Sequence, residues 1–478
     1  MSIQTNRIVS IIALMLVIMS FTSQADVIRL SASLKPANQN GTDPVLVTDP
    51  LGVVPSEASG SIRIQVNTDT STLAYQLVVS GIGREQLRAF GPNSTPIHLH
   101  LAAGGSPGNF GPIAVDLTLG AVDSDYTATD NGFRLSRQGV SILLEDQGNV
   151  KLGMHPGNEN IVAALQSGNA FVLVHTNKDI FVNNTGPAPG FPFAEIRGNL
   201  DRVQVTERAP AKGMDTVVLN DAVDVSSAAA DLVDKLEQQG FEIALIVDHA
   251  AAADSVNLNL APNQVIFARP PYRLEKWLLR RSQTVGIDLP FKFHVFDDGG
   301  VVKLSVNTLG YLIDRHDLSI HDFVLRYTDQ LISQFGKSRP ELHGLKTIQS
   351  LQSREDTVQA LLDAISANPD ARIPLVLDYN AGKRFRRNHR RHRALERTLT
   401  VFGNPNVGTP LMQAEPRMGI DLPLKFLVWT DFKGDVNITW NDPRFLAKRV
   451  NLQGQDARLD AIAKALETLA LKGAGQNP

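Results

Sequence analysis

Short apolar or alternating runs, separated by turn-forming residues, dominate the part of the chain that follows the N-terminal segment. Residues 61–66 (SIRIQV), 72–79 (TLAYQLVV), 96–101 (PIHLHL) and 171–176 (FVLVHT) have the length of strands, and glycine, proline and asparagine cluster between them. Short strands with this punctuation are typical of β-sandwiches and barrels. The pattern predicts an all-β domain over residues 26–208.

From about residue 213 the pattern changes to strands that alternate with helices. Residues 215–221 (DTVVLND) and 241–249 (FEIALIVDH) have the character of strands. Between them, residues 226–240 place apolar side chains on one helical stripe and end at a glycine. Residues 291–307 form a predicted hairpin with a turn at Asp-Gly-Gly. This order predicts an α+β domain.

The same order then occurs a second time. VGIDLPFKFHVF occupies residues 285–296, and MGIDLPLKFLVW occupies 418–429. Repetition of several elements in one order indicates a tandem duplication. We therefore predict two α+β copies, at 213–338 and 341–475, behind the β domain. We expect the copies to pack against each other, since a duplicated domain often reproduces the interface of an ancestral homodimer.

The N-terminal β region resembles the CHRD domain, a module first described in chordin. The resemblance rests on PIHLHLAAGGSPGNFGPIAVDL, SGNAFVLVHTNKD and FPFAEIRGNL, and it covers roughly residues 27–205. The sequence departs from the family at Leu101 and Ala194, where glycine is usual. The resemblance implies an extracellular β module and brings no established activity.

Both α+β copies resemble the family catalogued as domain of unknown function 302. The first copy carries VDHAAAADSVNLNL at 247–260, and the second carries FGNPNVGTPLMQAEP at 402–416, GIDLP at 419–423 and WNDPRFLAKR at 440–449. This resemblance implies an α+β sandwich and supplies no reaction.

The N-terminus and the amino-acid composition indicate an exported protein. Residues 1–25 combine one arginine, an apolar stretch too short to span a membrane, and small residues at the end, as a signal peptide does. We expect a periplasmic or secreted mature chain that begins at Asp26 and has no transmembrane segment. The chain has no cysteine, which excludes disulfides, a thiol nucleophile and cysteine-ligated metals.

Two histidines of the predicted strand 96–101 are candidate metal ligands. His98 and His100 are two positions apart, so their imidazoles share one face while the apolar residues between and beside them share the other. His175, on a later strand, is a candidate third ligand to copper or zinc, and His155 is a weaker fourth candidate. Alternatively, the histidines face solvent or bond to loop backbone.

The most basic segment of the chain is 383–397, KRFRRNHRRHRALER, in the second copy. Its cations are Lys383, Arg384, Arg386, Arg387, Arg390, Arg391, Arg393 and Arg397. At helical spacing several of them form one stripe, and their density exceeds what solubility requires. Two interpretations stay open, a binding surface for an anionic partner and a merely solvated charged face. For an exported protein the expected partner is a lipid phosphate, an acidic glycan, polyphosphate or an acidic protein surface, and nucleic acid is not expected.

A third candidate binding site, for a small anion, is the segment FGNPNVGTP at 402–410. Thr409 and Pro410 have the character of an N-cap and a first helical residue, a position where backbone amides hold small anions. The alternative, which the absence of a phosphate-loop lysine favours, is a plain strand-to-helix turn.

These patterns leave three hypotheses for function. The sequence lacks the G-x-S-x-G and H-E-x-x-H motifs and a complete phosphate loop, so no catalytic residue is assigned. The leading hypothesis is a non-enzymatic binding or scaffold protein that uses the basic segment. The competing hypothesis is a copper- or zinc-binding protein that uses His98, His100 and His175. The third is an enzyme with its site between the two copies.

Overall fold

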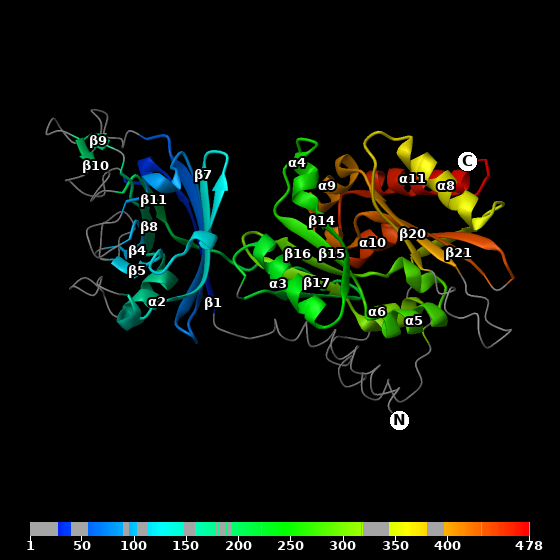
Figure 1. The fold of residues 1–478 in the computed structure, drawn as a ribbon, viewed down its shortest axis with the longest axis horizontal. Helices are drawn as coiled ribbons and strands as arrows, with labels where there is room; N and C mark the ends of the chain where they lie inside the picture. The colour runs from blue at the N-terminus through cyan, green and yellow to red at the C-terminus, as the bar shows by residue number, and fades with distance from the viewer. Residues whose placement is uncertain are drawn as a thin grey trace, which may run out of the picture.

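The computed structural model (Figure 1) contains one β domain followed by two α+β domains. It describes residues 27–39, 56–88, 95–102, 113–147, 158–177, 179–181, 187–189, 194–220, 222–316, 318, 344–379, 396–431 and 433–477. The predicted signal peptide and most of the basic segment, residues 383–395, lie outside the described residues. No helix in the described part is long and apolar enough to cross a membrane.

The β domain is a sandwich of two antiparallel sheets. One has the order β12-β1-β2-β3-β7-β6 and the other the order β11-β8-β4-β5. The strands of the first sheet are β1 (Val27–Leu34), β2 (Ser59–Asn67), β3 (Thr72–Ser80), β6 (Tyr126–Thr129), β7 (Gly132–Ser141) and β12 (Asp201–Arg202). Those of the second are β4 (Ile97–Leu101), β5 (Ile113–Asp116), β8 (Ala170–Val174) and β11 (Ile196–Asn199). Beside them lie α2 (Asn158–Ser167) and the short pair β9 (Asp179–Phe181) and β10 (Pro187–Pro189).

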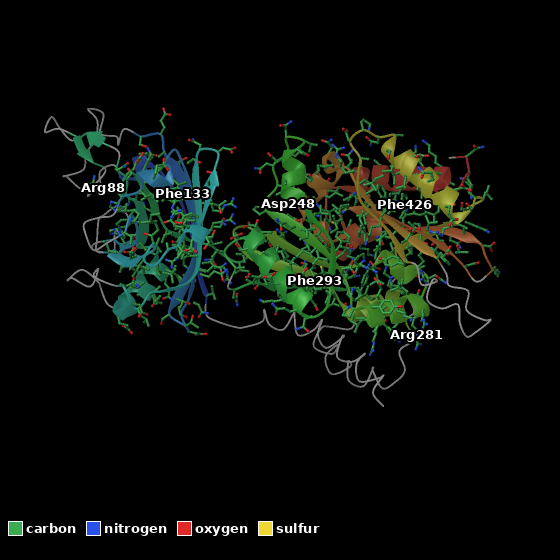
Figure 2. The ribbon with its side chains drawn as sticks, in the orientation of Figure 1. Arg88, Phe133, Asp248, Arg281, Phe293 and Phe426 are labelled. Carbon is green, nitrogen blue, oxygen red and sulfur yellow. The ribbon has the colours of Figure 1, made fainter. Side chains whose placement is uncertain are left out.

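The core of the sandwich follows the alternation of its strands. Ile62 and Ile64 of β2 meet Ile97 and Leu99 of β4 in one apolar cluster, and each is at most 1% exposed. Phe133, labelled in Figure 2, belongs to the same cluster. Successive side chains of a strand point to opposite faces. His98 and His100, which alternate with the apolar residues of β4, therefore point away from this core.

The first α+β copy is a five-stranded antiparallel sheet with helices. The strand order is β13-β17-β16-β15-β14. Its strands are β13 (Met214–Val218), β14 (Glu242–Asp248), β15 (Asn263–Arg269), β16 (Phe291–Asp297) and β17 (Val302–Asn307). Its helices are α3 (Val225–Gln238), α4 (His249–Asp254), α5 (Tyr272–Arg281), the 3₁₀ helix η7 (Thr284–Ile287) and α6 (Leu309–Arg315).

The second copy repeats this sheet strand for strand, which confirms the predicted duplication. Its order is β18-β22-β21-β20-β19. Its strands are β18 (Leu345–Gln349), β19 (Arg372–Tyr379), β20 (Arg397–Gly403), β21 (Leu424–Thr430) and β22 (Val436–Asn441). Its helices are α8 (Arg354–Ser366), α9 (Pro405–Ala414), the 3₁₀ helix η8 (Pro416–Asp421), α10 (Pro443–Arg449) and α11 (Asp456–Gly473).

Each copy covers the sheet of the other with the segment that carries the repeated GIDLP sequence. Helix η7 of the first copy packs on β20, β21 and β22 of the second, and η8 of the second packs on β15, β16 and β17 of the first. A Cβ atom on Gly286 of η7 would lie 3.0 Å from Leu427 Cδ1 of the other copy. A Cβ atom on Gly419 of η8 would collide with His294 and lie 2.7 Å from Asn263 Oδ1. The repeated motif therefore forms the interface between the copies.

Replacing Gly419 with alanine is expected to lower the free energy of unfolding by about 1–3 kcal/mol, because η8 would have to move away from β16. The matched control is Gly310→Ala in α6, where an added Cβ meets nothing within 4 Å. That change should be neutral or stabilising by up to about 1 kcal/mol. Chemical denaturation of the two variants checks the prediction, and equal stabilities would contradict it.

The β domain contacts the first α+β copy through polar side chains. Arg63 of β2 forms an ion pair with Asp297 at the end of β16, and Gln65 of β2 donates to the backbone oxygen of Ala222. Arg29 of β1 donates to the side chain of Asn220. In Figure 1 the β domain lies at one end of the molecule and the two α+β copies lie together at the other.

Candidate metal centre

The predicted histidine pair lies on β4, on the face of the four-stranded sheet that points away from the sandwich core. His98 is directly opposite Leu173 of β8, and His100 is directly opposite Phe171. His175 follows β8 two positions after Leu173, and its backbone amide donates to the Pro96 carbonyl at 2.8 Å. The backbone pairing of β4 with β8 therefore brings the third histidine to the same face as the first two.

The three imidazoles converge on one point. One ring nitrogen of each of His98, His100 and His175 lies within 4.8 Å of the corresponding atoms of the other two. The ring centroids of His98 and His100 are 5.7 Å apart, and those of His98 and His175 are 5.2 Å apart. Nitrogen ligands bind zinc at ~2.0–2.1 Å, so small side-chain rotations would allow all three to reach one ion.

The histidines are buried, contrary to the alternative that they face solvent. His98 is 0% exposed, His100 7% and His175 2%. Burial lowers the pKa of His175 to about 3 and lowers that of His98 well below its usual range, and the neighbouring imidazoles add to both shifts. These two imidazoles are consequently neutral at physiological pH, which is the form that binds a metal.

An aromatic ring and a cation complete one side of the cluster. His100 stacks on Phe171 with centroids 5.1 Å apart and ring planes 12° apart. The guanidinium carbon of Arg197 lies 3.6 Å from the centroid of the same ring. Arg197 is 0% exposed, and burial lowers its pKa to about 10. In the strand order β11-β8-β4, the strand of Phe171 lies between those of Arg197 and His100.

Asp116 of β5 is a neighbour of the cluster that the sequence analysis did not identify. It is directly opposite His98 on the other side of β4 and is 1% exposed. Its carboxylate accepts hydrogen bonds from the Thr95 hydroxyl and the Thr118 amide, and burial raises its pKa. The available signal was a single acidic residue inside the apolar run 113–117 (IAVDL).

Glu195 and Arg197 are two positions apart, a spacing that places both side chains on one face of a strand. Both are fully buried in the structure. Glu195 accepts hydrogen bonds from the hydroxyls of Ser56 and Thr176, and Arg197 Nε donates to Asn199 Oδ1 at 2.9 Å. Because Thr176 follows His175 directly, the Glu195 bond helps to fix the backbone that carries the third histidine.

Arg397, predicted to belong to the basic anion-binding stripe, has a different role. It is the first residue of β20 and is 2% exposed. Its guanidinium donates to the carbonyls of Leu279, Ser282 and Gln283 at and beyond the end of α5 of the other copy. A cation at a helix C-terminus satisfies carbonyls that lack intrahelical partners. Arg397 therefore holds the two copies together, whereas Lys383 to Arg393 lie outside the described residues and their role stays a prediction.

The segment 402–410 also differs from its prediction. The helix α9 begins at Pro405, and Asn404 is its N-cap, with its side chain accepting from the Asn406 amide at 2.9 Å. Thr409 and Pro410 lie inside this helix instead of starting one. The prediction failed because both Asn-Pro and Thr-Pro fit the start of a helix, and the sequence alone did not distinguish them.

Comparison with known proteins agrees with this architecture. Residues 30–179 match the family described as CHRD domain, and residues 216–334 and 346–469 each match the family described as Domain of unknown function DUF302. The two DUF302 matches together take up about half of the chain. The fold is thus that of a multidomain protein with a CHRD domain ahead of two tandem α+β domains. The chain belongs to the DUF302 family.

Two curated relatives and one solved structure are also similar to the chain. It is 31% identical over 201 residues to Fluoride-specific ion channel FluC 2 of Brucella melitensis biotype 1 and to FluC 1 of Brucella suis biovar 1. Each similarity covers 38% of this chain, with 71% of the first relative and 75% of the second. A crystal structure of an uncharacterized conserved DUF302 protein from Bacillus stearothermophilus matches 27% of this chain and 97% of its own, with 14% identity and a TM-score of 0.24.

Proposed function

We propose that this protein is an exported, non-enzymatic binding protein that holds a copper or zinc ion in its CHRD domain. The convergence of His98, His100 and His175 carries this proposal, because their ring nitrogens lie within 4.8 Å of one another in a buried site. Among the described residues, no other group of three histidine or acidic side chains meets this condition. The signal-peptide pattern of residues 1–25 and the extracellular character of CHRD domains support export.

The donor set favours copper or zinc over other ions. Imidazole nitrogen suits both metals, whereas calcium and magnesium require oxygen ligands. Three imidazoles leave a tetrahedral zinc ion one open position, and they also suit copper. Two of the imidazoles are already neutral through burial, so binding would not have to displace a proton from them.

Elemental analysis of protein purified without chelator or affinity-tag metal tests the proposal. We expect close to one copper or zinc ion per chain, and we expect the His98→Ala/His100→Ala double variant to lose it. Removing two of three ligands leaves a single imidazole, which cannot hold the ion at a buried site. The identity of the bound metal then distinguishes a copper-binding protein from a zinc-binding one.

A matched control is His294→Gln in the first α+β copy. His294 is 0% exposed like His98, but its ring bonds to Asn263 Oδ1 at 2.8 Å and lies outside the cluster. This variant should keep the metal. A wild-type protein that is empty and takes up neither metal on titration would overturn the proposal.

A further inference from the structure

Helix α5 of the first copy carries a basic and aromatic surface on the side that faces away from the core. On its inner side, Leu274, Leu278 and Leu279 are buried in the apolar core cluster. The outer side, which we term the α5 face, consists of Tyr272, Arg273, Lys276, Trp277, Arg280 and Arg281. Lys276 and Trp277 are half-buried, and the other four are exposed. Figure 2 shows Arg281, the last residue of the helix, at the lower margin of the α+β copies.

Cations and aromatic rings alternate along the α5 face. Residues four positions apart are neighbours on the surface of a helix. The face therefore has two rows, Tyr272-Lys276-Arg280 and Arg273-Trp277-Arg281. Lys276 Nζ lies 5.3 Å from the centroid of the Tyr272 ring. The guanidinium carbon of Arg281 lies 5.4 Å from the centroid of the Trp277 ring. Each row thus combines one aromatic ring with two cations, and the Tyr272 ring is 57% exposed.

The charges of α5 that reach solvent are all positive. The helix contains one acidic residue, Glu275, which is 6% exposed. Its carboxylate accepts hydrogen bonds from Arg269 Nε and Nη2 at 3.0 and 2.9 Å, on the inner side of the helix. Glu275 therefore does not neutralise the α5 face. Since the whole chain has a formal net charge of −3, this concentration of cations is a local feature.

The second copy shows that the fold does not require a basic helix at this position. Helix α5 lies between β15 and η7, and its counterpart α9 lies between β20 and η8. The sequence of α9, PNVGTPLMQA, has no charged residue. Because the two copies have the same strand order, the cations of α5 are not needed to form the domain. Their presence in one copy alone points to a partner of that copy.

We propose that the α5 face binds the surface of a membrane that contains anionic phospholipid. The four cations are complementary to lipid phosphate groups, which attract basic side chains at a membrane surface. Tyrosine and tryptophan have amphipathic rings that lie at the level of the headgroups. A soluble phosphate or polyphosphate would use the cations and leave both rings in water. The combination of the two side-chain types therefore favours lipid as the source of the phosphate.

The anchoring of α5 determines how the helix meets the membrane. Its leucines stay in the protein core, so the helix would lie along the surface without being inserted. Only the rings and the cationic ends of the outer side chains would reach the headgroups. This surface lies in the first α+β copy and uses none of the β-domain histidines, so it stands independently of the metal-binding proposal.

Vesicle flotation tests the proposal. The mature chain, which begins at Asp26, is used because the apolar residues 8–21 would bind lipid by themselves. We expect it to float with vesicles of phosphatidylglycerol and phosphatidylcholine and to stay behind with vesicles of phosphatidylcholine alone. Binding should weaken as the salt concentration rises, because salt screens charges at a surface.

Substitutions in the last turn of α5 should weaken this binding. Arg280→Gln/Arg281→Gln is expected to weaken it about thirtyfold, since each cation near an anionic membrane contributes about fivefold. Arg280→Lys/Arg281→Lys keeps both charges and should bind like the wild type. The matched control, Arg458→Gln/Lys464→Gln, removes two exposed cations from α11 of the other copy and should leave binding unchanged. Circular dichroism checks that each variant keeps the wild-type fold.

Trp277 reports whether the α5 face itself enters the headgroup region. Its fluorescence emission should shift to shorter wavelength when anionic vesicles are added, because its ring leaves water. The Trp277→Phe variant should still float with these vesicles but lose the shift, although Trp429 and Trp440 remain. Soluble polyphosphate offers phosphate charges without a bilayer and should not produce the shift.

Three outcomes would overturn the proposal. The first is a wild-type chain that floats with neither kind of vesicle. The second is equal vesicle binding by the wild type and Arg280→Gln/Arg281→Gln; if Arg386→Gln/Arg387→Gln then loses binding, the contact belongs to the basic segment 383–397. The third is binding of polyglutamate, lost in the α5 double variant, without vesicle binding, which would make the α5 face a docking site for an acidic protein.

Discussion

Asp421→Ala is expected to lower the free energy of unfolding by about 3–5 kcal/mol. Asp421 is 2% exposed and is the carboxylate that both Lys292 and Arg449 contact at the interface between the copies. Its removal would leave those two cations without their carboxylate partner at a buried interface. Breaking a buried pair costs far more than the pair contributes when intact, because the remaining charges stay desolvated.

Urea denaturation followed by tryptophan fluorescence measures this effect, since all three tryptophans, Trp277, Trp429 and Trp440, lie in the α+β copies. Asp460→Ala is the matched control. Asp460 pairs with Arg444 at 2.7 Å, but these side chains are 62% and 53% exposed. The control should change stability by no more than about 1 kcal/mol. Similar losses for the two variants would show that the buried network is not a main source of stability.

The metal-free protein is expected to lose stability in its β domain as the pH falls from about 6.5 toward about 3. Burial lowers the pKa of His175 from 6.5 to about 3 in the folded state. In this window the unfolded chain binds more protons than the folded chain, so acid favours unfolding. The stability that depends on the neutral, buried histidine is therefore fully present above about pH 6.5 and is lost as the pH falls. His98 shifts in the same direction, and the combined loss is on the order of a few kcal/mol.

Circular dichroism follows this transition across the whole chain, and tryptophan fluorescence follows the α+β copies alone. The His98→Phe/His175→Phe double variant should flatten the acid dependence seen by circular dichroism and leave the fluorescence transition unchanged. Copper or zinc should raise stability most at neutral pH, because protons compete with the metal for the imidazoles in acid. An acid dependence that is identical in the double variant would exclude the histidines as its source.

Local patterns were sufficient to predict the elements and their repetition. The period of two in PIHLHL placed His98 and His100 on one face of a strand, and the structure confirms a strand at Ile97–Leu101. The repeated GIDLP motif indicated a duplication, and the two sheets have the same strand order. These features depend on residues close in the chain or on the order of elements, and both are visible in the sequence.

The sequence by itself determined the fold class, the tandem repeat and the histidines that could bind a metal. Only the tertiary structure decided that the histidine face is buried, that Arg397 binds carbonyls of the other copy and that Lys292 pairs with Asp421 of the other copy. The physical reason is that burial and charge pairing depend on contacts between residues more than a hundred positions apart, such as Lys292 with Asp421. Periodicity reports which side of an element a residue occupies, but it does not report what packs against that side.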